Sequence, residues 1–451
     1  MRNHFSKKLG LSLAVFGIAT TGMFMGQDAE AMPGFARQTG MPCNACHFQT
    51  FPALSAMGRG FKMDGYTMEG SQASIEGENA LKLPDTLNIG GVIKIRHNKA
   101  GGDFTKTGDE ADFGRLDFPD EAALLVGGRL SANSGFLWEF AVKAETNLLG
   151  AKYVFNAAKA GDIQFQVIPY STDGQGTGYG QELMNNATVG LQRIAEDKTY
   201  SAPVQLGFVS AAAGLNLVAQ SSNWAFNYNM FAPVFPGEHK GEVAMNITGL
   251  ATYMRGVYFM DLAGFDTGVG FGQYSGTVKT MGNDTTSGTT KQTLAKDSSG
   301  NDTTTVLSEA TTYSKHKEVY LAPTGSFVDF QMQGEIAGMQ TGFYFSTGSV
   351  PEAGKAADTT YSYAAAKAKS ATGMAVKVGV TPELFVTFQN GSRAEGDVQS
   401  DGKTAMTHAG SSLGLQYMIS QNVKFEFTNK SDAPSEGKST SLQQMMLFIG
   451  M

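Results

Sequence analysis

Short stretches in which apolar and polar side chains alternate recur along most of this sequence, and they restrict the folds open to it. One stretch has Trp224, Phe226, Tyr228 and Met230 at alternate positions, and they enclose two asparagines. A period of two puts alternate side chains on opposite faces of a β-strand. The same pattern occurs at residues 136–143, 163–167, 328–333 and 423–428. The chain is therefore expected to be mainly β.

The chemistry of the two strand faces separates a membrane barrel from a water-soluble β fold. Val328 and Phe330 alternate with Asp329 and Gln331, so an aromatic face opposes a face of charges and amides. A soluble β-sandwich also alternates and is the competing fold, but its core would not tolerate such polar groups. An apolar, aromatic exterior around a polar interior is typical of outer-membrane barrels. We therefore predict an antiparallel β-barrel in contact with outer-membrane lipid.

The length of the β region sets the size of this barrel. Residues 81–451 would hold roughly 14–18 strands, with about 16 favoured, and so a lumen wide enough for water. A tight turn is expected at 131–135 and a closing strand at 443–451. Residues 281–317 are rich in Thr, Ser, Asn and Asp and are expected to form a surface loop.

The N-terminus carries an export signal. Arg2, Lys7 and Lys8 precede an uncharged apolar stretch at 9–25, and the small-x-small pattern Ala29–Ala31 follows. This is the layout of a secretory signal peptide at 1–31, and the apolar stretch is short for the alternative, a membrane anchor. The chain has a net charge of −7, which argues against a nucleic-acid partner.

The two cysteines of the chain stand in the motif Cys43-Asn44-Ala45-Cys46-His47. Two thiols on one turn can form thioethers to both vinyl groups of a haem, and the adjacent imidazole then reaches the iron. A redox-active cysteine pair would need a thioredoxin-like α/β pattern, and a zinc site would need two more ligands nearby. The motif thus predicts one covalent haem c, bound through Cys43 and Cys46, with His47 as the proximal ligand of the iron.

The segment between the signal and the barrel is too short to enclose a haem alone. Residues 32–80 number about fifty, and a domain of that size buries little apolar surface. The lumen of the following barrel could provide the missing cover. We therefore expect a short α-helical haem segment at 32–80 that plugs the lumen of a barrel formed by 81–451.

Three methionines are candidates for the second axial ligand of the haem iron. Pro52–Lys62 is expected to be a short helix, and Met63 at its end allows the chain to pass round the haem edge. We rank Met63 first, then Met68, then Met57, although any of them could simply pack against haem or barrel. Methionine–histidine ligation would raise the reduction potential relative to two histidines.

The strand at 87–97 contains another histidine, but its position does not suit iron ligation. His97 falls in the register of the outward-facing apolar residues of that strand. Lys94 and Arg96 fall in the inward register, from which they could meet haem propionates.

The haem region resembles a known family. The residues that carry the resemblance are Ala36–Cys43, His47, Phe51–Pro52, Leu54, Gly58–Arg59, Phe61–Lys62 and Gly65–Tyr66. They are similar to the N-terminal module of the fused monohaem cytochrome–porins, the outer-membrane iron oxidases of iron-oxidising bacteria. The matching motif covers about residues 34–70. The resemblance implies a haem in the barrel mouth or lumen, extracellular Fe(II) as electron donor, and a periplasmic c-type cytochrome or similar carrier as acceptor.

The sequence thus predicts an outer-membrane oxidoreductase, an Fe(II)-oxidising cytochrome. Three other functions remain compatible with it. The protein could be a porin or solute channel with a haem-bearing plug, or an electron conduit whose donor is not iron. A soluble periplasmic electron carrier with a β domain is the third.

Overall fold

The structure is a computed structural model, and it describes most of the chain beyond the predicted signal peptide. The described ranges are 33–70, 72–78, 81–102, 114–141, 148–172, 182–184, 191–196, 200–208, 212–232, 249–289, 293–296, 302–305, 311–352, 367–398, 404–434 and 440–451. The predicted signal peptide at 1–31 lies outside them. The domain boundaries after residues 31 and 80 stay predictions.

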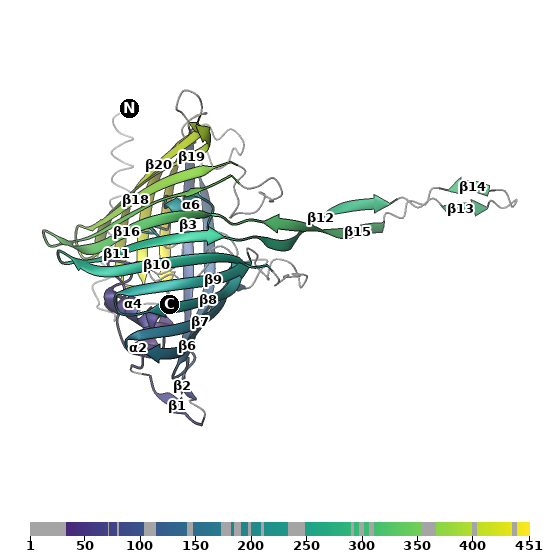
Figure 1. Ribbon diagram of the computed structural model, residues 1–451. Helices are drawn as coiled ribbons and strands as arrows, with labels where there is room; N and C mark the ends of the chain where they lie inside the picture. Colours follow the sequence, from purple (N-terminus) through teal and green to yellow (C-terminus); the bar gives the residue numbers. More distant parts are fainter. Residues whose placement is uncertain are drawn as a thin grey trace, which may run out of the picture.

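Within these ranges, sixteen antiparallel strands form one closed barrel (Figure 1). In the order in which they follow one another along the chain, the barrel strands are β3 (Ile89–Gly102), β4 (Arg115–Ser131), β5 (Ser134–Ala141), β6 (Leu148–Ala160), β7 (Ile163–Thr172), β8 (Ala212–Gln220), β9 (Trp224–Ala232), β10 (Ala251–Leu262), β11 (Phe265–Ser275), β16 (Gly325–Ile336), β17 (Met339–Val350), β18 (Lys369–Gly379), β19 (Leu384–Val398), β20 (Thr404–Ser420), β21 (Val423–Pro434) and β22 (Thr440–Gly450). The predicted fold class and the favoured strand number are confirmed.

The connections between these strands differ sharply at the two ends of the barrel. At one end, which we call the turn end, successive strands join through a few residues, as at Ser131–Ser134 between β4 and β5. At the other, the loop end, the connections are longer, and β7 and β8 are separated by residues 173–211. The seam pairs β22 with β3, so the predicted closing strand is confirmed.

Burial on the barrel wall is the inverse of that in a soluble protein. The Phe226 side chain is 38% exposed while Asn227 beside it is 0% exposed, and Val328 is 52% exposed while Asp329 is 3% exposed. A closed barrel satisfies its backbone hydrogen bonds and presents this apolar exterior to lipid. The protein is therefore an outer-membrane type of barrel, and the soluble β fold is excluded. None of the helices in the described ranges has the length and apolar character to cross a bilayer.

Part of the predicted surface loop at 281–317 is strand. β12 (Val278–Thr289) pairs with β15 (Thr311–Leu321), and β13 (Thr293–Lys296) pairs with β14 (Asp302–Thr305). These hairpins project far from the barrel (Figure 1). Threonine-rich sequence favours extended backbone, so polar composition alone was a poor guide to the structure here.

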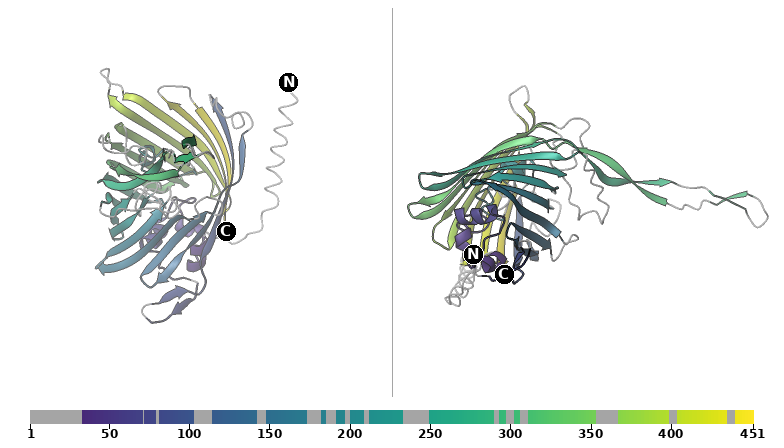
Figure 2. Two further views of the ribbon diagram at one scale, coloured as in Figure 1. Left: turned by 90° about the vertical axis from the view of Figure 1, so that its right-hand side faces the viewer. Right: turned by 60° about the horizontal axis from the view of Figure 1, so that its bottom comes forward.

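Three short helices lie within the ring of strands: α2 (Pro33–Thr39), α3 (Cys43–Cys46) and α4 (Ala56–Met63) (Figure 2). Their segment contacts several parts of the wall. Arg59 pairs with Asp266 at the start of β11, with Nη1 and Oδ2 2.8 Å apart. On another side, Phe51 stacks on Phe448 of β22 with ring centroids 6.2 Å apart. The helical segment therefore fills part of the lumen near the turn end.

The connection between β7 and β8 also folds into the lumen. It includes α6 (Ala202–Gln205), and the amide of Ala202 donates to Ser346 Oγ of β17 at 2.8 Å. Tyr200 Oη donates to the carbonyl oxygen of Ser411 of β20 at 3.1 Å. The amide of Leu54, in the helical segment, donates to the carbonyl oxygen of Leu183 in this connection. The two inserted segments therefore support each other.

A small hairpin links the helical segment to the barrel. β1 (Ser74–Glu76) pairs with β2 (Lys82–Pro84), and the hairpin protrudes at the bottom of Figure 1. Leu81 forms a bridge to Ser131 at the β4–β5 turn, which places the hairpin at the turn end.

Candidate functional site

The C-x-x-C-H motif folds as one helical turn followed by an extended residue. α3 spans the two cysteines, and the amide of His47 donates to the carbonyl oxygen of Cys43 at 2.8 Å. Cys43 is buried, and burial raises the pKa of the partly buried Cys46 thiol. Both residues lie in the described part of the chain, and no disulfide joins them. The two thiols therefore come from positions three apart on one helical turn, and the imidazole-bearing residue directly follows the second.

The tautomer of His47 follows from its hydrogen bond. Nδ1 lies 3.0 Å from the carbonyl oxygen of Ala53, which can only accept, so Nδ1 carries the proton. Nε2 then has the lone pair that a metal ion binds. Burial lowers the pKa of His47 and outweighs the opposing effect of the Ala53 bond, which favours the neutral ring. This ring also packs against Phe51 in a T-shaped arrangement, with centroids 5.7 Å apart.

Helix α4 is docked closely against α3. Ser55 caps it, accepting from the amide of Gly58 at 3.2 Å and donating to the carbonyl oxygen of Ala45 at 2.7 Å. A Cβ atom on Gly58 would overlap the carbonyl oxygen of Cys46. Glycine at position 58 therefore permits this close approach of the two helices.

The three candidate methionines differ in burial. Met63 at the end of α4 is 8% exposed, Met68 is half-buried, and Met57 is 44% exposed. The carbonyl oxygen of Met63 accepts hydrogen bonds from the side-chain amides of Gln166 in β7 and Gln220 in β8. The barrel wall thus holds the backbone of Met63 in place, although its role as a ligand stays a prediction. The alternation of the strands predicts that Gln166 faces inward, but not that it binds Met63.

Lys94 faces the lumen, as its register predicts, and its partners are carboxylates. Its Nζ lies 2.6 Å from Glu121 Oε2 and 2.5 Å from Glu196 Oε1 of the β7–β8 connection. Arg193 also reaches Glu196, at 2.9 Å. Burial alone would raise the pKa of Glu196, but the surrounding cations hold it far below its usual value. Arg96, the second predicted inward base, pairs with Asp120 at 3.0 Å.

A second charged group forms between the β7–β8 connection and another part of the wall, and the sequence alone did not predict it. Arg255 of β10 donates to Glu182 of the β7–β8 connection at 3.2 Å and to Asp329 of β16 at 3.0 Å. All three are buried. A Cβ on Gly270, in the intervening β11, would lie 2.6 Å from the guanidinium, so glycine leaves room for the pair. Burial raises the pKa of Glu182 to about 7, although Arg255 opposes the shift.

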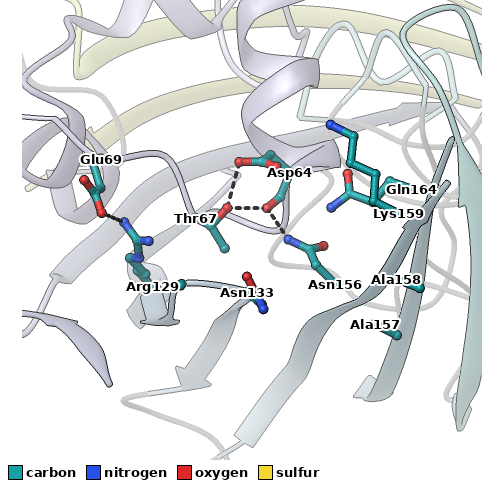
Figure 3. Close-up of a pocket in the computed structure, with 11 residues that line it drawn as sticks. Asp64, Thr67, Glu69, Arg129, Asn133, Asn156, Ala157, Ala158, Lys159 and Gln164 are labelled. Atoms are coloured by element: carbon teal, nitrogen blue, oxygen red, sulfur yellow. Dashed lines mark hydrogen bonds and ion pairs between the residues drawn. The ribbon is translucent and has the colours of Figure 1, made fainter. Parts of the chain in front are cut away.

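The turn end also contains an open cleft of about 530 Å³ (Figure 3). It lies where the chain leaving α4 meets the turns of the wall. Its polar lining consists of Asp64, Thr67, Glu69, Arg129, Asn133, Asn156, Lys159 and Gln164. Neither in this cleft nor in the rest of the described ranges is a group of three or more His, Cys, Asp or Glu side chains arranged to hold a metal ion.

No protein-family model matches this chain, and no curated protein sequence matches it. Among solved structures, it is similar to OprB of Pseudomonas putida, with 11% identity and a TM-score of 0.49 over 81% of this chain and 94% of that one. It is also similar to OmpT of Vibrio cholerae, with 9% identity and a TM-score of 0.44 over 84% and 100%. A third similar structure is the outer-membrane channel DcaP of Acinetobacter baumannii, with 11% identity and a TM-score of 0.44 over 84% of this chain and 100% of that one.

Proposed function

We propose that this protein is an outer-membrane c-type cytochrome that takes electrons from extracellular Fe(II) and passes them to a periplasmic c-type cytochrome or similar carrier. One observation carries the proposal: Cys43 and Cys46 share a helical turn, and His47 follows with Nε2 left free by the Ala53 bond. These are the donor atoms that covalent haem c requires.

Four residues of the helical segment would have distinct roles toward the haem. Cys43 and Cys46 would form the thioethers, and His47 would ligate the iron, its basicity raised by the bond from Nδ1–H to Ala53. Met63 is the proposed second ligand. When bound, haem c supplies one-electron Fe(III)/Fe(II) chemistry. Methionine–histidine ligation would place its potential where electrons from iron can be accepted.

The two segments inserted into the lumen favour electron transfer over free diffusion of solutes. The helical segment and the β7–β8 connection are bonded to the wall and to each other, through Arg59–Asp266, Arg255–Glu182 and Leu54–Leu183. Segments bonded in this way would restrict the passage of solutes and would not hinder the transfer of an electron. Each Fe(II) would lose one electron and remain outside as Fe(III), and a one-electron carrier on the periplasmic side would receive it.

A solute channel with a haem-bearing plug is the second candidate. The observation that favours it is the barrel itself, because sixteen strands enclose a lumen wide enough for water and small solutes. In that function the helical segment would restrict or gate the channel. Conductance in planar bilayers addresses this candidate directly, since a functioning channel opens in discrete steps.

The decisive experiment mixes the purified, oxidised protein in detergent with Fe(II) under anaerobic conditions. Reduction of the haem, followed by its absorption, should consume one Fe(II) per protein. The His47→Ala variant is the control for nonspecific reduction. A haem that stays oxidised in excess Fe(II), but is reduced by dithionite, would overturn iron as the donor. Step-like conductance in the unmodified protein would favour the channel.

A further inference from the structure

The turn end presents a surface that the proposed reaction does not yet explain. It consists of the open cleft and the neighbouring β1–β2 hairpin, and we call it the turn-end face. Its acidic members are Asp64, Glu69, Glu76, Glu78 and Asp85, and its exposed apolar members are Ile75 and Leu81.

Carboxylates outnumber bases among the described residues of the turn-end face. Its five acids face three bases, Lys82, Arg129 and Lys159, and Arg129 is bound to Glu69. Ile75 is 53% exposed and Leu81 is 41% exposed, and both lie on the hairpin among carboxylates. Lys82 is the one base of the hairpin's described residues, and it is already paired with Glu76 at 3.3 Å and with Glu69. An apolar contact surface surrounded by negative charge suits a partner with the complementary arrangement.

The cleft is held in a fixed shape by bonds between the helical segment and the wall (Figure 3). Thr67 Oγ1 donates to Asp64 Oδ2 at 2.7 Å, and Asn156 Nδ2 of β6 donates to the carbonyl oxygen of Asp64 at 3.1 Å. Glu69 is bound by Arg129 of β4. A preformed cleft of this kind loses little entropy when a partner binds.

The turn-end face is built directly onto the proposed haem segment. The Gln38 side chain in α2 donates to the carbonyl oxygens of Tyr66 and Met68, at 2.7 and 3.0 Å. A Cβ on Gly70 would overlap the backbone of Thr39, four residues before Cys43. The chain that forms the rim of the cleft therefore packs on the helix that leads into the C-x-x-C-H motif.

We propose that the turn-end face is the docking surface for the electron acceptor, a soluble redox protein whose lysine and arginine side chains surround an apolar patch. This inference rests on the proposed function and names the partner's surface. The partner's apolar patch would cover Ile75 and Leu81, and its cations would face the hairpin carboxylates. Asp64 in the cleft, with the amide oxygens of Asn133 and Gln164, would accept its N–H donors.

The test uses ferricytochrome c, a basic protein, and its succinylated form, in which the lysine charges are reversed. Binding to the full-length protein in detergent is measured by calorimetry at low ionic strength. Because calorimetry detects the heat of binding, the measurement needs no bound haem. Glu78→Lys with Asp85→Lys reverses two charges on the hairpin. Glu335→Lys, which reverses one charge on the exposed β16–β17 hairpin across the barrel, is the control for charge reversal outside the proposed surface.

The double variant should bind ferricytochrome c about tenfold more weakly, and added salt should abolish this difference. The Glu335→Lys variant should bind as the parent does, and the succinylated protein should bind the parent poorly. Equal weakening by both variants, or none by the double variant, would overturn the proposal. The rate of electron transfer from the dithionite-reduced protein to ferricytochrome c should rank the variants in the same order as their binding. Because dithionite supplies the electrons, failure of Fe(II) to reduce the haem would count against the proposed donor and not against this surface.

Discussion

Gly58 of α4 lies against the carbonyl oxygen of Cys46 in α3, so closely that the two atoms leave no room for a methyl group. The amide of Ser55 donates to this same carbonyl oxygen at 3.0 Å. The helix that ends at Met63 is therefore placed by its contact with the cysteine-bearing turn. The orientation of α4 depends on the absence of a side chain at one position.

Replacement of Gly58 by alanine should displace α4 from α3. The overlap would strain the segment by about 1–3 kcal/mol, because it meets backbone rather than a flexible side chain. We expect less covalent haem per protein and an altered axial-ligand spectrum. Gly60→Ala is the matched control, since a Cβ at that position meets nothing within 4 Å. Identical haem content and spectra in the two variants would contradict the close packing.

The motif residues should each leave a distinct chemical signature. In Cys46→Ala, one thioether is lost, and the α-band of the alkaline pyridine haemochrome should move to longer wavelength. In His47→Ala the iron loses its proximal ligand, and the ferric spectrum should change from low to high spin. His97→Ala provides the comparison and should retain the parent spectrum. Parental spectra in both Cys46→Ala and His47→Ala would refute haem attachment at this motif.

Met63→Ala should abolish the methionine-to-iron charge-transfer band in the near infrared and lower the reduction potential, because a softer ligand to iron is lost. Met57→Ala should change neither, since that side chain is 44% exposed. The measurement is a spectroelectrochemical titration of each variant. Loss of the band in Met68→Ala alone would transfer the assignment to Met68.

Stability should decline as pH rises from about 4.5 to about 7. Burial raises the pKa of Glu182 to about 7 from a usual 4.5, so the folded protein holds this proton more tightly than the unfolded chain. The stabilisation that this bound proton provides is complete below the pKa of the unfolded chain. It is lost as the pH rises through the pKa of the folded protein, and the total loss is of order 3 kcal/mol. Thermal midpoints of Glu182→Gln should vary less over this range. Glu383→Gln, an exposed acid at a turn, should keep the parental profile.

Removal of Arg255 should be more damaging than removal of the whole ion pair. Arg255→Met leaves Asp329 buried without its counter-charge, at a cost of about 3–5 kcal/mol. Adding Asp329→Leu should restore part of this loss, because the uncompensated charge is gone. Urea unfolding in detergent gives the free energy of unfolding of the single and the double variant. A double variant less stable than Arg255→Met would show that the remaining Glu182 or the cavity dominates.

The barrel was predictable because alternation is a local property. The pattern at 224–230 and 328–333 set which side chains face lipid, and the described strands follow it: Asn227 and Asp329 are buried while Phe226 and Val328 are exposed. The favoured strand number followed from chain length and the usual size of a strand with its connection. The inward register of Lys94 followed from the same parity.

The segments inside the lumen were harder to predict from the sequence, because their positions depend on contacts between distant residues. Glu182 and Arg255 are 73 positions apart, and Gln220 meets the carbonyl oxygen of Met63 from 157 positions away. An acidic residue in a long connection normally indicates a solvated loop. Nothing in the local sequence distinguished the β7–β8 connection from the others. The cleft at the turn end likewise arises from a meeting of segments that the sequence separates.

The seam between β22 and β3 has a consequence for biogenesis. The strand that completes the barrel is the last one in chain order, whereas α2, α3 and α4, which lie inside the wall, precede every barrel strand. During export, the cysteine-bearing turn would enter the periplasm well before the final strand is available to seal the cylinder. The order of elements along the polypeptide would thus allow the proposed haem to be attached to an open, accessible segment before membrane insertion encloses it.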